Sequence, residues 1–113
     1  MVPPIPKEKI DLSNHAHVRG WDRFDMTLAE RKRAIIGIIQ TGDWYVSPTQ
    51  EDGWLVLGRV GRRWICVIVA AEVGKLRVIT VWEMTNPGQL APYKDHDPDG
   101  PYRASDVAGW YGL

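Results

Sequence analysis

Four segments rich in β-branched and aromatic residues follow one another closely, and they constrain the fold more than any other feature of the chain. The connections between them contain PTQEDG, GR and EVG, and residues of these types adopt the backbone angles that tight turns need. Because such short connections join antiparallel neighbours, the sequence predicts a four-stranded antiparallel meander. The four segments are WYVS (44–47), GWLVLGRV (53–60), RWICVIVAA (63–71) and KLRVITVWEM (75–84).

The pattern within these segments predicts how each strand faces its surroundings. The third segment is apolar at consecutive positions, as expected for a strand buried on both faces, so we place it in the centre of the sheet. Arg59 and Arg77 stand inside strands, where an arginine either extends to solvent at a sheet edge or lines a cleft. The last segment alternates, with Leu76, Val78, Thr80 and Trp82 expected on one face and Arg77, Ile79 and Val81 on the other.

Two helices are expected before the strands. Residues 13–24 predict a short helix capped by its first polar residues. Thr27 and Glu30 have the spacing of a capping box, and Gly42 marks the end of a second, amphipathic helix. Together these elements predict an α+β fold in which two N-terminal helices pack on one face of the four-stranded antiparallel meander.

The chain is expected to contain one domain with a flanking segment at each end, as its 113 residues suggest. Residues 1–10 are rich in proline and are expected to be extended, because proline fixes φ and removes a backbone donor. Residues 11–85 are expected to form the α+β domain. Residues 86–113 are expected to form a turn-rich tail that ends in a short helix from Ser105.

The charge balance and the single cysteine limit the classes of function. Lys and Arg together number 14, as do Asp and Glu, which argues against a strongly basic nucleic-acid binder but leaves room for a local basic groove. Cys66 lies in an apolar run and has no second cysteine to pair with. The chain has no apolar segment typical of a secretory signal or of a membrane span, which predicts a cytoplasmic protein without a membrane partner.

A polar stripe on the first predicted helix is the first candidate site. His15, Arg19 and Asp22 are spaced so that they share one side of a helix. A histidine can exchange protons near neutral pH, and an arginine one turn away can hold a phosphate, which is the pairing that ribonuclease chemistry uses. The alternative is a solvated helix face in which Arg19 and Asp22 form an ion pair.

The segment DHDPDGPYRASD is the second candidate site, because it begins like an EF-hand calcium loop. Its departures are a tyrosine at the eighth position, two prolines in the loop and a poor entering helix, so an acidic surface turn is the alternative. No other cofactor is expected, since the histidines and Cys66 match no standard zinc spacing. The candidate calcium ligands are Asp95, Asp97, Asp99 and Asp106.

The order of the elements and three short motifs resemble a known toxin family. The motifs are HAHVR (15–19), the hairpin GRVGRRW (58–64) and the closing RVITVW (77–82). In these features residues 11–85 resemble the small toxin domains of the BrnT type and a related family whose first helix begins with an HA-x-x-R-like signature. Both families belong to the RelE-like ribonuclease-toxin superfamily.

The resemblance implies an endoribonuclease toxin that cleaves RNA without a metal ion and is inhibited by a cognate antitoxin. His15 and Arg19 match the signature of the first helix, and Thr80 matches a position of the last strand that lines the site in relatives, so these three are the catalytic candidates. The candidate RNA-binding residues are Arg59, Arg77 and Trp82.

A second hypothesis is a non-catalytic protein-binding regulator on the same scaffold, of the kind that a phage or mobile element encodes. The neutral charge, the long tail and the six tryptophans depart from a basic catalytic toxin and favour this reading. Tryptophan and tyrosine are typical anchors of protein interfaces. The candidate anchors are Trp54, Trp110 and Tyr111.

Overall fold

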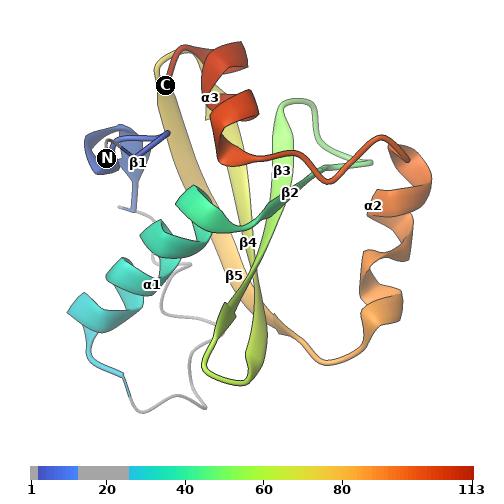
Figure 1. Cartoon of the computed structure of the whole chain (residues 1–113), viewed down its shortest axis with the longest axis horizontal. Coiled ribbons are helices and arrows are strands. Elements are labelled where there is room, and N and C mark those ends of the chain that lie inside the picture. Colours follow the sequence, from blue (N-terminus) through green and yellow to red (C-terminus); the bar gives the residue numbers. More distant parts are fainter. Residues whose placement is uncertain (1–2, 13–25) are drawn as a thin grey trace.

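The structure is a computed structural model that describes residues 3–12 and 26–113. Its described part is a five-stranded sheet in the order β1-β5-β4-β3-β2, with helices on both faces (Figure 1). The strands are β1 (Ile10–Asp11), β2 (Asp43–Val46), β3 (Gly53–Val60), β4 (Arg63–Glu72) and β5 (Lys75–Met84). The helices are α1 (Leu28–Thr41), α2 (Ala91–His96) and α3 (Ala104–Tyr111), and the short 3-10 turns are η1 (Lys7–Lys9) and η3 (Pro87–Leu90).

The four predicted strands are confirmed, and β4 lies in the centre of the sheet as expected. The whole of β3 pairs antiparallel with β4, from Gly53 opposite Ala70 to Val60 opposite Arg63. The turn between them is tight because Gly61 adopts a φ of 63°, a conformation that L side chains rarely take. The turn residues therefore fixed the register of this hairpin.

The predicted arrangement of two N-terminal helices on a four-stranded antiparallel meander is wrong. β1 precedes α1 and adds a fifth strand parallel to β5, with Ile10 opposite Leu76. A strand of two residues carries no alternating pattern, so periodicity could not reveal it. Burial of Ile5 and Ile10 holds this segment in the core, where Gln40 of α1 also donates to the Ile5 carbonyl at 3.0 Å. The helix predicted over 13–24 lies outside the described residues.

The second predicted helix is confirmed as α1. The Thr27 hydroxyl accepts from the Glu30 N–H at 3.2 Å, and the Glu30 carboxylate accepts from the Thr27 N–H at 3.4 Å, which completes the capping box. Ile35, Ile38 and Ile39 are buried against the sheet. A Cβ on Gly58 would lie 2.7 Å from Ile38, so glycine lets α1 approach β3 closely at this point.

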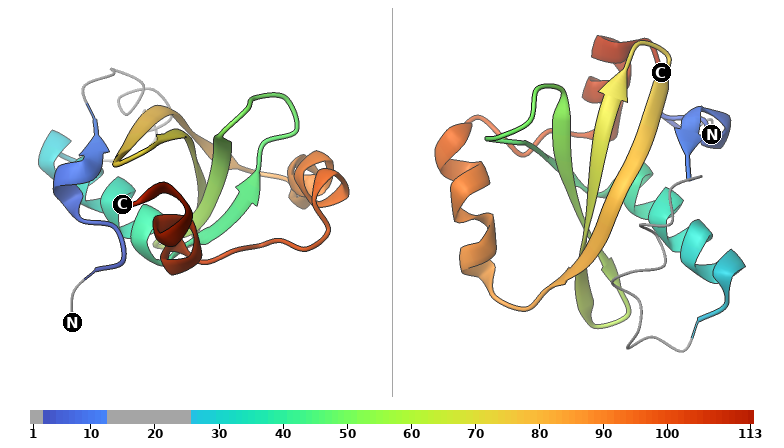
Figure 2. Two further views of the ribbon diagram at one scale, coloured as in Figure 1. Left: turned by 90° about the horizontal axis from the view of Figure 1, so that it is seen from above. Right: turned by 180° about the vertical axis from the view of Figure 1, so that it is seen from behind.

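The tail contains more helix than the sequence predicted. The expected short helix is confirmed as α3, which begins at Ala104 and buries Val107. η3 and α2 were missed, although Pro92 suits the first turn of a helix because its absent N–H would have no partner there. These two elements pack on the face of the sheet opposite α1 and α3 (Figure 2), so the expectation that helices cover one face alone is also corrected.

A β-bulge in β5 changes which side chains share a face. Ile68 lies opposite Thr80 and Val69 lies opposite Val78, so Ile79 is an extra residue in the ladder. The regular alternation expected from the sequence is therefore wrong beyond Val78. Leu76, Val78 and Val81 point into the main core, whereas Arg77, Thr80 and Trp82 share the other face.

Candidate functional site

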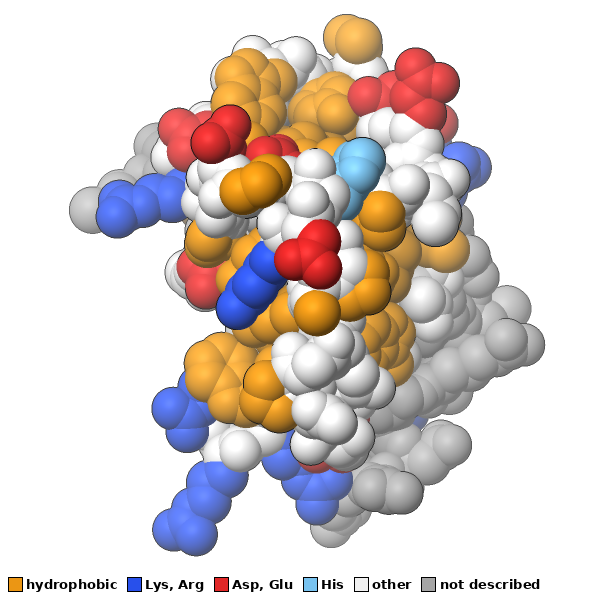
Figure 3. All heavy atoms as spheres, turned by 90° about the vertical axis from the view of Figure 1, so that its right-hand side faces the viewer, with side chains coloured by type: hydrophobic (Ala, Val, Ile, Leu, Met, Phe, Trp, Pro, Cys, Tyr) orange, Lys and Arg blue, Asp and Glu red, His pale blue; other side chains and the backbone are white. Residues whose placement is uncertain are grey.

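The face of the sheet that carries Leu57, Cys66 and Trp82 is incompletely covered by the described elements, and we call it the open face. Of these elements, η3 and α2 pack on it, where Leu90 and Tyr93 cover its β2–β3 half. Over β4 and β5 the side chains of Ile68, Trp82 and Met84 are only partly buried. Hydrophobic side chains remain visible around α2 on this side of the molecule (Figure 3).

One end of the open face combines an exposed indole with an arginine. Arg59 lies directly opposite Trp64 across the β3–β4 hairpin, and its guanidinium carbon is 5.2 Å from the centroid of the indole ring. Trp64 is 41% exposed. A cation over one side of the ring orients the indole and leaves a flat apolar surface beside a positive charge.

The second indole of the open face lies close to the first in the ladder. Trp82 is opposite Cys66, while Trp64 is opposite Met84, so the two tryptophans occupy diagonal positions on neighbouring strands. Diagonal neighbours are about 7–8 Å apart, within reach of aromatic side chains. β4 and β5 therefore present two indoles in a fixed order along the sheet.

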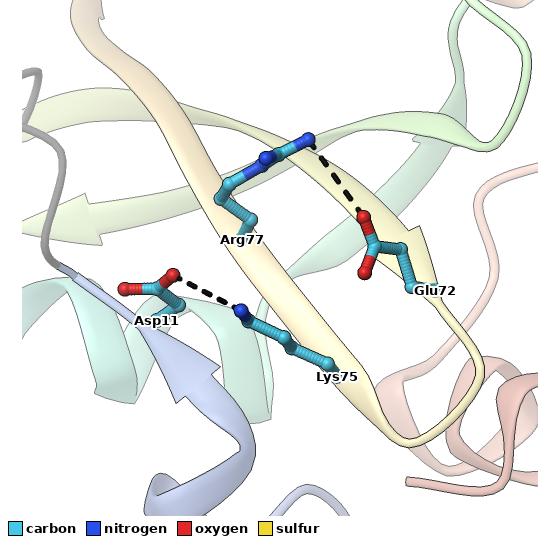
Figure 4. A network of polar contacts seen from close by, with 4 residues as sticks. All are labelled: Asp11, Glu72, Lys75 and Arg77. Carbon is cyan, nitrogen blue, oxygen red and sulfur yellow. Dashed lines mark ion pairs between the residues drawn. The ribbon is translucent and has the colours of Figure 1, made fainter.

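Two further predicted residues lie on the open face, because the bulge moves Thr80 onto the face that already carries Arg77. Thr80 lies two residues before Trp82 and opposite Ile68. Arg77 lies farther along, where its Nη2 atom is 3.8 Å from Glu72 Oε1; the neighbouring Lys75 pairs with Asp11 at 3.5 Å (Figure 4). About half of each side chain in the Arg77–Glu72 pair is exposed, so the pair contributes little free energy and Arg77 can exchange Glu72 for another anion.

Cys66 lies beneath the open face and is not a nucleophile. The residue is completely buried, and burial raises the pKa of its thiol to about 12. Because the thiolate is the reactive form, the thiol is inert at neutral pH. Burial and the neighbouring Cys66 also raise the pKa of Tyr93, which therefore stays protonated.

The catalytic candidates His15 and Arg19 lie outside the described residues, as does Asp22 of the same stripe. Of the sequence-predicted site, the structure places Arg59, Arg77, Thr80 and Trp82 on one face, with Arg59 at the β3–β4 hairpin and Arg77 toward the β4–β5 turn.

The predicted protein-binding residues come together elsewhere, between α3 and the opposite face of the sheet. Trp54 is only 5% exposed, and its Nε1 donates to the Tyr111 hydroxyl at 3.1 Å. That hydroxyl donates in turn to Asp52 at 2.9 Å. Trp110 is stacked on Trp54 with 6.1 Å between ring centroids and is 58% exposed. Trp54 therefore packs the tail onto the sheet, while Trp110 faces outward.

The acidic segment of the tail uses its carboxylates for local hydrogen bonds. Asp97 accepts from the Asp99 N–H at 3.1 Å and from the Tyr102 hydroxyl at 2.8 Å. Asp106 accepts from the Arg103 N–H at 3.3 Å at the start of α3. Within residues 3–12 and 26–113, no three His, Cys, Asp or Glu side chains are grouped so as to hold a metal ion, and calcium binding by Asp95 and its neighbours stays a prediction.

Trp64 is the site residue that the sequence reasoning missed, although the signal was present. A two-residue turn at Gly61 and Arg62 pairs Val60 with Arg63, and the next pair is then Arg59 with Trp64. Because directly opposite residues point to the same face, the hairpin alone predicts the contact between Arg59 and Trp64.

Comparisons with protein-family models, with curated proteins and with solved structures found no match to this chain. Among the helices that the structure describes, none is long and apolar enough to cross a membrane; the longest, α1, has 14 residues.

Proposed function

We propose that this protein binds single-stranded RNA on the open face. The observation that carries the proposal is the placement of Arg59, Trp64 and Trp82 on one partly exposed face of an antiparallel sheet. Unpaired bases stack on aromatic side chains, each for about 1–3 kcal/mol, while arginine binds the phosphates between them. Sheets that present aromatic residues in this way are a recurrent RNA-binding surface.

The distribution of charge supports the same surface. The formal net charge is zero, but Arg59 and Arg62 lie at the β3–β4 hairpin, beside Arg63, which pairs with Glu83 at 3.5 Å. In Figure 3 several Lys and Arg side chains lie at the lower end of the molecule, where Figure 1 places this hairpin; others lie higher up, where most visible Asp and Glu side chains are found. A phosphate backbone is therefore attracted to the end that carries Trp64.

The proposal favours single strands over duplexes for a geometric reason. In a duplex the faces of the bases are stacked on one another and are not available to an indole. Trp64 and Trp82 present flat rings rather than a groove-filling helix, so an unpaired segment can use both.

We also propose that the bound RNA is cleaved without a metal ion, as in a RelE-like toxin controlled by an antitoxin. The support is the sequence pattern of His15, as general acid or base, and Arg19, as phosphate ligand. Thr80 is the catalytic candidate that lies on the open face, two residues from Trp82, so RNA stacked on this indole passes beside its hydroxyl.

RNA binding is tested by fluorescence anisotropy with a labelled single-stranded RNA of about 12 nucleotides, within the usual site size of such proteins. Trp82→Ala and Trp64→Ala are each expected to weaken binding at least five-fold, and the matched control Trp110→Ala is expected to bind like the wild type. Equal affinities of the wild type and both open-face variants would reject the proposed surface.

Cleavage is tested separately by RNA degradation with the wild type and His15→Ala, each with and without EDTA. Cleavage that survives EDTA and disappears in His15→Ala is the expected result. Loss of activity in EDTA, or undiminished cleavage by the variant, would contradict the catalytic part while leaving the binding result intact.

A further inference from the structure

The exposed indole of Trp110 belongs to a rigid aromatic cluster at the end of the molecule opposite the β3–β4 hairpin. It stacks on Trp54, and the ring of Tyr102 meets it edge-on with 5.2 Å between centroids. Trp54 and Tyr102 also contact each other at 5.9 Å. Because contacts with two rings that also contact each other fix its orientation, Trp110 presents an exposed surface that loses little conformational freedom when a ligand binds.

A second exposed hydrophobic residue lies near this cluster. Val73 at the β4–β5 turn is 91% exposed. The adjacent Gly74 N–H donates to the Tyr111 carbonyl at 2.8 Å, which holds the turn against the end of α3. Trp110 and Val73 are two of the four large hydrophobic residues that are exposed in the described part of the chain, and both lie at this end.

Carboxylates surround the cluster on several sides. Asp52 accepts from Tyr111, which also binds Trp54, and Asp97 accepts from Tyr102. The hydrogen bond to Asp97, then burial and the charges of Asp97 and Asp99, raise the pKa of Tyr102. Asp106 precedes Trp110 by four residues on α3 and so lies one turn away. The exposed indole therefore stands in a negative potential.

Three basic residues of the neighbouring segments make other contacts. Lys9 donates to the Gly112 carbonyl at 3.1 Å, beyond the end of α3. Arg77 pairs with Glu72. Arg103 lines a pocket of about 410 Å³ with Gln40 and Thr41, on the side of α3 that faces α1. A ligand that approaches Trp110 from the side of Asp52 and Asp106 therefore meets carboxylates.

From these contacts we infer that the surface around Trp110 docks a positively charged peptide segment of a partner protein. An arginine or lysine of the segment stacks on the exposed indole, and Asp52 and Asp106 balance its charge. Phosphate groups are repelled by the same carboxylates, so this surface is distinct from the proposed RNA-binding face. The inference does not depend on the proposed function.

The experiment uses a synthetic peptide of about 12 residues with arginines separated by small residues, and a matched peptide in which every arginine is glutamine. Isothermal titration calorimetry with the full chain is expected to show binding of the arginine peptide and none of the glutamine peptide. Trp110→Ala is expected to weaken binding at least five-fold, and Trp64→Ala is expected to leave it unchanged.

A second variant keeps the test valid if loss of the indole perturbs α3. Asp106→Asn retains a side-chain acceptor at the start of the helix and removes one charge, so the fold is expected to persist while peptide affinity falls at least two-fold. Equal binding of the two peptides, or undiminished affinity in both Trp110→Ala and Asp106→Asn, would overturn the inference. Sedimentation showing head-to-tail self-association that Arg62→Glu abolishes would overturn it as well, because the occupant would then be a second copy of the chain.

Discussion

Two groups of tryptophans lie on opposite faces of the same sheet and differ in what surrounds them. On the open face, Trp64 and Trp82 occupy diagonal positions, and Arg59 is stacked on the first of them. On the other face, Trp54 is buried under α3, and Trp110 continues the stack outward among carboxylates. The residue type is the same in both groups, so the neighbouring charges and the strand register decide what each group can bind.

The largest expected difference between the two groups is in stability. Trp54→Ala removes a buried indole from the contact between β3 and α3, and it is expected to lower the free energy of unfolding by about 3–5 kcal/mol. Trp64→Ala removes a side chain that is 41% exposed, and its expected cost is below about 1 kcal/mol. Urea denaturation of both variants measures the difference. Similar losses in the free energy of unfolding would show that Trp64 stabilises the fold as Trp54 does and is not available for binding.

The hydrogen-bonded chain from Trp54 through Tyr111 to Asp52 gives a smaller effect. Tyr111→Phe leaves the buried Trp54 Nε1 without its acceptor and is expected to cost about 1–3 kcal/mol. Tyr93→Phe, on the open-face side, is the matched control, with an expected cost below about 0.5 kcal/mol. Thermal unfolding compares the two variants. A Tyr111→Phe protein as stable as the control would show that the hydrogen bonds from Trp54 through Tyr111 to Asp52 do not stabilise the fold.

The smallest expected effect is the alkaline titration of Cys66 beneath the open face. The folded thiol has its pKa raised from 9.0 to about 12, so the unfolded state loses its proton first as the pH rises. The stabilising contribution is complete below pH 9 and is lost as the pH rises toward 12. Between pH 8 and pH 10 the free energy of unfolding of the wild type is expected to fall by about 1 kcal/mol more than that of Cys66→Ala, as measured by urea denaturation. Parallel pH profiles would show that the thiol is accessible.

Much of the sheet was predictable from the sequence because local signals specify it. The turns of the two hairpins contain Gly61 and Gly74, each with a positive φ, and the capping box of Thr27 and Glu30 marks the start of α1. The fifth strand was not predictable from local sequence. Ile10 pairs with Leu76, which is far away in the sequence, so only tertiary contacts determine this pairing.

The candidate site was predictable in its residues but not in its geometry. Side chains alternate along a regular strand, so odd-numbered and even-numbered residues lie on opposite faces. A regular strand would therefore place Arg77 on the face opposite Thr80 and Trp82. The bulge at Ile79 is a property of the paired ladder, which is why alternation alone gave the wrong face. The balanced composition likewise hid the separation of the arginines near Trp64 from the carboxylates near Trp110.

The most direct test of RNA binding on the open face is a ¹H–¹⁵N spectrum of the tryptophan indoles during two titrations, because each of the six tryptophans gives its own Nε1–H signal. With single-stranded RNA the signals of Trp64 and Trp82 are expected to shift, while those of Trp54 and Trp110 stay in place. With the arginine peptide the signal of Trp110 is expected to shift, and those of Trp64 and Trp82 are not. RNA-induced shifts confined to Trp110, or no shift of either open-face indole at saturating RNA, would contradict the assignment of RNA binding to the open face.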